Sequence, residues 1–404
     1  ETVNVSLRFL SGDEKSLFGK GRVAAMTGAM LSRGSTKFTR TQIADESDKL
    51  KMQGGVSGLS ANYQTTRPNL AQSIRLAAHL MREPAFPQAE FEQLKKQMLT
   101  QIESQKSDPE AIASVALGQH FNQFPRGDVR YSPTLAEAEE DVNAVTLQQV
   151  QDFHRQFYAA AKGQIAVVGD FDEAEVEKAV REAFADWKGG VPYQRVTTPY
   201  QDIAPAGKSI ETPDKENAIF LARLNLNAQD TDRDFAALWI ANYIMGGGAG
   251  LDSRLAARIR EKDGLSYAAG SQLNVSSIDR AGHWLAFAIG APQNMTKIEA
   301  AFNEEVARAL KDGFTADELA KAKSGALQQR LQRRAQDGPL AGGIRNNLYL
   351  GRTFAWSAEL EAKIQALKPE DVTAAFRKHI DPKKITIIKA GDFAKVAKGG
   401  EGKK

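Results

Sequence analysis

Apolar side chains along this chain follow two periods, one typical of strands and one typical of amphipathic helices. Residues 2–10 (TVNVSLRFL) alternate between polar and apolar side chains, which predicts a half-buried strand at the start of the chain. Long helical patterns follow at Phe86–Gln105 and again at Phe314–Arg334. Because strands cluster early and late around paired helices, without strict βαβ alternation, the pattern favours an α+β fold.

The second half of the chain repeats landmarks of the first half in the same order. A polar turn with a glutamate opens each long helix, and an amphipathic helix later leads into a β-branched run that ends in Gly-Asp-Phe. The matched segments are residues 58–63 and 264–269, 86–91 and 314–319, 146–157 and 368–379, and the Gly-Asp-Phe ends at Gly169 and Gly391. Two copies do not make a solenoid, so the repeat predicts a duplicated domain.

These patterns divide the chain into two similar units. We predict a first domain at residues 1–190, a linker at 191–207 that contains Pro192, Pro199 and Pro205, and a second domain at 208–394. Each domain is expected to be a mostly antiparallel sheet covered by helices. Gly and Lys dominate residues 395–404, which predicts a disordered tail. The chain begins within a strand pattern, from which we expect a processed or excised piece of a longer protein.

Composition narrows the classes of function. The 404 residues include 53 basic and 50 acidic side chains, a balance that gives no reason to expect a nucleic-acid partner. The chain has no cysteine, which excludes disulfides, thiolate metal sites and cysteine nucleophiles. No apolar run is long enough to predict a membrane-spanning helix.

The sequence lacks the spacing that common catalytic centres require. Two imidazoles one helical turn apart can hold one zinc ion, yet no two of the five histidines lie that close, and we expect structural or surface roles for them. They are His79, His120, His154, His283 and His379. The glycine-rich run at Gly246–Gly250 follows a helical pattern and lacks the Lys-Ser/Thr of a phosphate loop, so we interpret it as a turn.

Two segments of the chain, described below, resemble the insulinase/pitrilysin family of zinc peptidases. Its members pair two halves of similar α/β domains. The active half carries H-x-x-E-H on its first long helix and a glutamate ligand on a later helix, and the other half supplies an Arg and a Tyr in a pattern like R-x-x-x-G-L-x-Y. Residues 19–36 resemble the helix that should carry the zinc motif, and residues 246–267 resemble the glycine-rich turn followed by S-R-L and R-E-x-x-G-L-x-Y.

When the family pattern is aligned with this chain, the zinc ligands and the general base fall on residues that cannot bind zinc or activate water. The two histidines fall on Ala25 and Ala29, the catalytic glutamate on Gly28, and the third ligand on Gln101. An alanine cannot bind metal, and a glycine cannot activate water as a general base. The resemblance therefore implies an inactive site with no cofactor in this chain, and zinc in a partner half.

The Arg and Tyr of the family pattern are present as Arg260 and Tyr267. The resemblance implies that they assist a zinc-bearing homologous half, on the same precursor or on a separate chain, in hydrolysing peptides or unfolded polypeptides. Alone, the chain is expected to be inactive; paired, it would be part of a metalloendopeptidase. The alternatives are an inert core subunit like those of respiratory complexes, or a stand-alone peptide-binding module. Bacterial relatives point to the periplasm.

Overall fold

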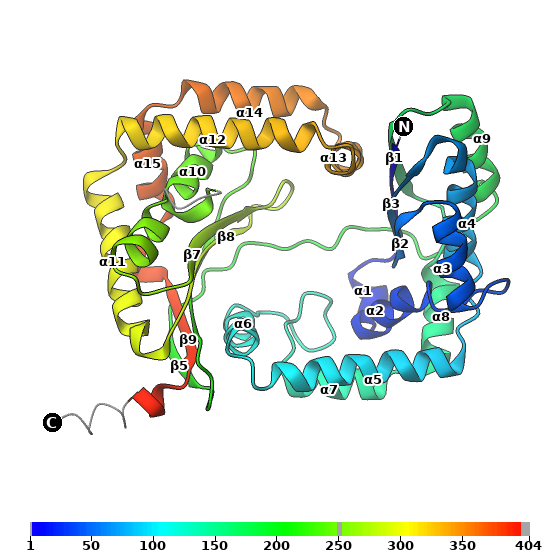
Figure 1. Cartoon of the computed structure of the whole chain (residues 1–404), viewed down its shortest axis with the longest axis horizontal. Coiled ribbons are helices and arrows are strands. Elements are labelled where there is room, and N and C mark those ends of the chain that lie inside the picture. The colour runs from blue at the N-terminus through cyan, green and yellow to red at the C-terminus, as the bar shows by residue number, and fades with distance from the viewer. Residues whose placement is uncertain (1, 249–252, 397–404) are drawn as a thin grey trace.

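The computed structural model describes residues 2–248 and 253–396, which form two lobes that face each other across the centre of the molecule (Figure 1). Each lobe is built around one sheet, with most of its helices on the side away from the other lobe. A segment without helix or strand, residues 185–206, joins the lobes. The predicted α+β architecture of mostly antiparallel sheets covered by helices is confirmed.

The first lobe contains a four-stranded antiparallel sheet in the order β2-β3-β1-β4. Its strands are β1 (Thr2–Phe9), β2 (Gln53–Ser57), β3 (Ser60–Thr66) and β4 (Gly163–Gly169). The helices of this half are α1 (Glu14–Leu17), α2 (Gly21–Met30), α3 (Arg40–Lys49), α4 (Leu70–Arg82), α5 (Gln88–Gln105), α6 (Pro109–His120), α7 (Leu135–Ala144), α8 (Leu147–Phe157) and α9 (Glu173–Phe184).

The second lobe contains a five-stranded sheet in the order β5-β9-β6-β8-β7. Its strands are β5 (Gly207–Glu211), β6 (Ala218–Leu226), β7 (Ala268–Val275), β8 (Gly282–Gly290) and β9 (Thr386–Gly391). The helices are α10 (Phe235–Asn242), α11 (Met295–Asp312), α12 (Ala316–Arg334), α13 (Asp337–Leu350), α14 (Phe354–Ala366) and α15 (Pro369–His379). Two π-helical segments, Tyr243–Gly247 and Ala256–Lys262, lie between α10 and β7.

The two sheets share one topology. In the first, β1 pairs with β3 and β4, and β2 lies beyond β3; in the second, β6 pairs with β8 and β9, and β7 lies beyond β8. The second sheet adds β5, which runs parallel to β9 and is the one departure from antiparallel pairing among the described strands. Gly207, which the sequence places in the linker, is the first residue of β5. The predicted tail lies outside the described residues from position 397 onward.

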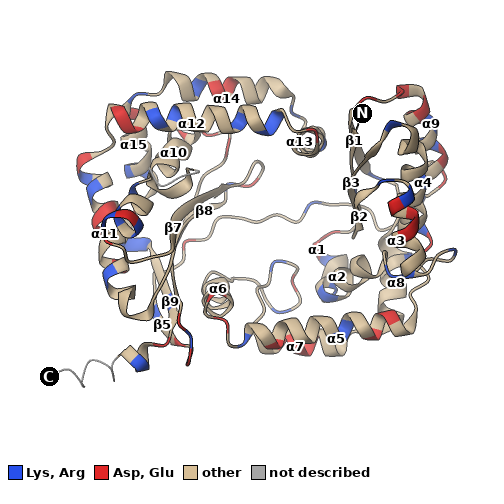
Figure 2. Ribbon diagram, in the orientation of Figure 1, with Lys and Arg blue, Asp and Glu red and all other residues tan. Residues whose placement is uncertain are grey.

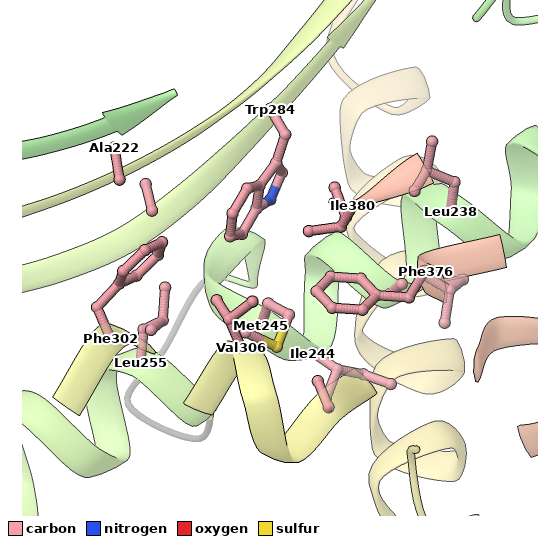
Figure 3. Close-up of a cluster of buried hydrophobic side chains, with 14 of the residues drawn as sticks. Ala222, Leu238, Ile244, Met245, Leu255, Trp284, Phe302, Val306, Phe376 and Ile380 are labelled. Atoms are coloured by element: carbon pink, nitrogen blue, oxygen red, sulfur yellow. The ribbon is translucent and has the colours of Figure 1, made fainter. Parts of the chain in front are cut away.

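Each lobe has its own apolar core between sheet and outer helices. In the second lobe, Trp284 points from β8 toward Phe302 of α11 and Phe376 of α15, with ring centroids 5.9 and 6.2 Å away (Figure 3). All three rings are fully buried, and burying a side chain of this size contributes about 2–3 kcal/mol. The Trp284 indole N–H donates to Asn242 Oδ1 at 3.0 Å, so the buried polar atom is satisfied.

One helix from each half of the chain packs against the inner face of the other half's sheet. Helix α6 packs Ala113 and Leu117 against Ile219 and Leu221 of β6. In return, α13 lies against β1 and β4, where the Arg8 guanidinium sits 4.7 Å from the Tyr349 ring centroid. This exchange is visible in Figure 1, where α6 approaches the second lobe and α13 the first. These contacts join the lobes in addition to the chain segment that connects them.

Charges of both signs are interspersed along the outer helices α11, α12 and α14 (Figure 2). Mixed surfaces of this kind do not attract a polyanion, in keeping with the near balance of acidic and basic residues. Across the described ranges, no helix is both long and apolar enough to cross a bilayer.

Candidate functional site

Helix α2 is where the resemblance places the zinc ligands, and here it serves as a packing element. Met26 and Met30 are fully buried in the core of the first lobe. Ala25 is exposed and Ala29 is half-buried, one helical turn apart as the two histidines of a zinc motif would be. The backbone spacing for a metal site is therefore present, and the side chains that would bind the metal are missing.

Gly28 is where the resemblance places the general base, and the structure leaves no room for a side chain there. A Cβ on Gly28 would lie 2.7 Å from the backbone nitrogen of Gly58 and 2.8 Å from its Cα. Gly58 is in the turn between β2 and β3 with a φ of +57°, so the obstacle is backbone that cannot rotate away. A carboxylate at position 28 would require this hairpin to move.

The third ligand position, Gln101, is exposed on α5, a helix that contacts α2. Ala25 lines a hollow of about 500 Å³ that Gln101 does not line. Both carboxylates of that lining are in ion pairs, since Asp141 accepts from Arg126 at 2.9 Å and Asp128 pairs with Arg130. The hollow therefore presents paired carboxylates in place of a metal-binding group.

Each histidine has a separate structural partner. His154 bonds the Met81 carbonyl oxygen at 2.7 Å, and burial lowers the pKa of its imidazole. The partners of the other four are Ser35 for His79, Ala204 and Thr386 for His120, Asn274 for His283, and Asp234 for His379. Among residues 2–248 and 253–396, no three His, Asp or Glu side chains are grouped so as to hold a metal ion.

Arg260 lies in the last turn of the π-helical segment Ala256–Lys262, and Tyr267 lies at the end of the short turn that connects this segment to β7. The Tyr267 side chain is 68% exposed. Arg260 is about half exposed, and its one ion pair within the described residues is a loose contact of 3.8 Å with Glu261. Exposed pairs of that kind are worth well under about 1 kcal/mol. Both side chains are therefore free to engage another molecule.

The turn itself is well anchored. Leu265 is buried next to Ile259, whose carbonyl accepts the Leu265 N–H at 2.9 Å, and the Leu265 carbonyl accepts from Asn294 at 3.1 Å. Gly264 has a φ of +60°, a left-handed conformation that glycine adopts without strain. The Tyr267 N–H donates to the Ile289 carbonyl oxygen at 2.8 Å, which ties the end of the turn to the sheet. Two exposed polar side chains are thus presented on a rigid support.

A buried ion pair holds the start of this segment. Arg254, with a side chain only 7% exposed, donates to both carboxylate oxygens of Glu318 at 2.6 and 2.8 Å and to the Gly313 carbonyl at 2.8 Å. Burial acts to raise the pKa of Glu318, but the bonds from Arg254 and Thr315 outweigh it and lower the pKa to about 2. The pair joins the Arg260 segment to the first turn of α12.

Sequence reasoning did not assign this pair. Two signals were present: Arg254 belongs to the S-R-L run, and Thr315 with Glu318 forms a capping box at the start of α12. The glycine-rich turn before Arg254 lies partly outside the described residues, at positions 249–252. Gly246, which is described, packs so closely on β7 that a Cβ would lie 2.4 Å from the Ser271 backbone nitrogen.

The part of the chain that contains Arg260 and Tyr267 matches a known protein family. Residues 144–326 match the family described as the peptidase M16 inactive domain. This part of the chain, a little under half of it, is similar to a peptidase M16 inactive domain. The matched range contains Arg260 and Tyr267 and begins well after α2. The resemblance to zinc peptidases of this family, in its non-catalytic form, is confirmed.

The similar proteins include one named as a non-peptidase and one named as a protease. It is 22% identical to the "Non-peptidase homolog YmxG" of Helicobacter pylori, over 95% of this chain and 87% of that one. Its fold matches the crystal structure of a peptidase M16 inactive domain from Pseudomonas fluorescens with a TM-score of 0.80 at 24% identity, covering 96% of this chain and 93% of that one. It also matches the periplasmic protease PqqL of Escherichia coli with a TM-score of 0.72 at 14% identity, covering 96% of this chain and 42% of that one.

Proposed function

We propose that this chain is the non-catalytic half of a zinc metalloendopeptidase. The observation that carries the proposal is the contrast between the two sites. Helix α2 has no metal-binding side chain at the positions where the resemblance places the ligands, and its backbone packs against Gly58, while Arg260 and Tyr267 are exposed on an anchored segment. A scaffold has no use for two polar side chains held in this way.

The chemistry of peptide hydrolysis gives both residues a role. Attack of zinc-activated water on a peptide carbonyl produces a tetrahedral oxyanion. The Tyr267 hydroxyl can donate a hydrogen bond to that oxygen, and the Arg260 guanidinium can hold the substrate backbone beside it. Preorganised donors act strongly because no reorganisation is needed at the moment of reaction. Zinc and the general base would come from the partner half.

The partner is proposed to be a homologous, zinc-bearing half that closes a chamber with this one. The match to PqqL supports this arrangement, since the chain covers about two fifths of that longer protease. The partner would be linked in the same precursor or bound as a separate subunit, and unfolded peptides would be the substrate. The periplasmic location of PqqL makes the periplasm the proposed compartment.

Reconstitution tests the proposal directly. The chain is co-expressed with a zinc-bearing M16 homologue from the same genome, and cleavage of a quenched fluorescent peptide is measured for each protein alone and for the purified pair. We expect a stable complex whose turnover exceeds that of the zinc-bearing protein alone at least about tenfold, since the oxyanion donors arrive with this chain. No complex, or a complex with unchanged turnover, would contradict the proposal.

A second candidate function is an inert subunit, and the name of the YmxG relative favours it. In that case the chain would organise an assembly and contribute no chemistry. Purification from the native source separates the two candidates. A peptidase half is expected to co-purify with a zinc-bearing homologue. A core subunit is expected to co-purify with membrane components and to show no peptide cleavage.

A further inference from the structure

A hollow of about 430 Å³ opens on the inner face of the second sheet; neither Arg260 nor Tyr267 lines it, and it is built from both halves of the chain. Its floor comes from three neighbouring strands, β6, β8 and β7. Its walls come from the residues that follow α6 and from the segment that connects the lobes. The side chains that matter for its chemistry are Arg223, Asn225, Asn274, His283, Phe121 and Tyr200.

Arg223 is the unusual group in this hollow. Its guanidinium is stacked on the Phe121 ring, 4.2 Å from the centroid, and its one hydrogen bond within the described residues is to Asn225 Oδ1 at 3.1 Å. The Nε atom is buried and has no hydrogen-bond partner. No described carboxylate pairs with it, and burial lowers the pKa of Arg223 to about 10, so it still carries a full charge at neutral pH.

The other charges around the hollow leave that positive charge uncompensated. Asp279 lines the same hollow, but Arg195 binds both its oxygens at 2.6 and 2.8 Å and the Thr198 N–H donates to it at 2.9 Å. Burial and the nearby Arg223 lower the pKa of His283 to about 4, which keeps the imidazole neutral at physiological pH. The hollow therefore holds one desolvated cation among amide, imidazole and aromatic groups.

A guanidinium that is buried without a hydrogen-bond acceptor destabilises the protein. A ligand that supplies the missing acceptor removes this destabilisation when it binds. Arginine presents a planar fork of N–H groups that matches the two oxygens of a carboxylate. Asn274, which contacts His283 at 3.1 Å, adds an amide donor on the same floor, and the aromatic walls can cover an apolar body. A volume of this size accommodates one or two residues of a peptide.

We propose that this hollow is a binding site for a peptide carboxylate, presented either by a chain terminus or by an acidic side chain. That the carboxylate belongs to a peptide rests on the proposed function; that the site selects a carboxylate rests only on Arg223 and its surroundings. Because the hollow lies between the residues that follow α6 in one half and the sheet of the other half, an occupant would also bridge the two lobes.

Titration calorimetry on the full chain tests this without any catalytic assay, so its outcome is separate from that of the peptidase proposal. Acetyl-Ala-Ala-Phe with a free C-terminal carboxylate is compared with its C-terminal amide. We expect the acid to bind at least about tenfold more tightly, as one charge-assisted contact implies. An amidated peptide with one glutamate then distinguishes a terminal from a side-chain carboxylate. Equal binding of acid and amide would overturn the proposal.

Variants provide a second test. Arg223→Gln should abolish the preference for the acid, since the amide side chain keeps the volume and loses the charge. Arg280→Gln is the matched control, because this exposed arginine on the hairpin between β7 and β8 pairs with Asp232 and does not line the hollow. An acid preference that survives in a folded Arg223→Gln protein would contradict the assignment.

Discussion

Replacing Arg260 by Ala or Tyr267 by Phe in the assembled peptidase is expected to lower kcat by about tenfold or more while leaving the fold intact. Loss of a preorganised oxyanion donor has this effect because its bond to the developing charge exists only in the transition state. Both side chains are exposed and make no bond on which folding depends. Steady-state kinetics on the reconstituted enzyme, with thermal unfolding of each variant, measures the two parts of the prediction.

Lys262→Ala is the control for Arg260→Ala. It removes one positive charge from the same π-helical segment, at another exposed position, so a purely electrostatic effect of net charge would appear in both variants. We expect Lys262→Ala to retain wild-type turnover. Equal rates for wild type, Arg260→Ala and Tyr267→Phe would remove both residues from the mechanism.

The second large effect concerns the ion pair that supports this turn. Glu318→Gln is expected to destabilise the protein by about 2–3 kcal/mol at pH 7, because the charge of Arg254 would remain buried without a counter-ion. Glutamine can still serve in the capping box with Thr315, so the substitution isolates the charge. Urea denaturation at equilibrium measures the change in free energy of unfolding.

The same substitution has a defined dependence on pH. The pKa of Glu318 is lowered from 4.5 to about 2 in the folded protein, so the pair contributes fully above pH 4.5 and its contribution is lost as the pH falls toward 2. The difference in stability between wild type and Glu318→Gln should therefore narrow as the pH is lowered through this window.

Asp317→Asn is the control, since Asp317 is an exposed neighbour whose side chain is 75% accessible. It removes the same charge from the same helical turn and should change stability by less than about 0.5 kcal/mol. A stability difference between wild type and Glu318→Gln that stays constant from pH 7 to pH 3 would show that the ion pair does not provide the stabilisation.

Much of the fold could be predicted from local chemistry. The Thr315–Glu318 capping box marks the start of α12, and the periodic apolar residues before Gly169 and Gly391 mark equivalent strands. These signals are local, since they depend on a helix end or on one face of a strand. The closeness of Arg260 and Tyr267 along the chain can also be read from the sequence, because only seven residues separate them.

The rest depends on contacts between distant segments. Nothing in the pattern of α6 indicates that it covers the sheet of the other half, because an amphipathic helix does not specify its partner. The stacking of Arg223 on Phe121 and the contact between Gly28 and Gly58 arise only when the chain is folded. From the sequence alone, a glycine within a helix indicates only a low helix propensity. The structure shows that Gly28 is needed because two backbones approach each other closely there.

The zinc content of the purified chain tests the central claim most directly. The chain is expressed with excess zinc, desalted, and measured by inductively coupled plasma mass spectrometry alongside a zinc-bearing M16 homologue as the positive control. We predict no stoichiometric zinc in this chain and about one zinc per molecule in the homologue. One tightly bound zinc per chain, together with peptide cleavage by the chain alone, would contradict it.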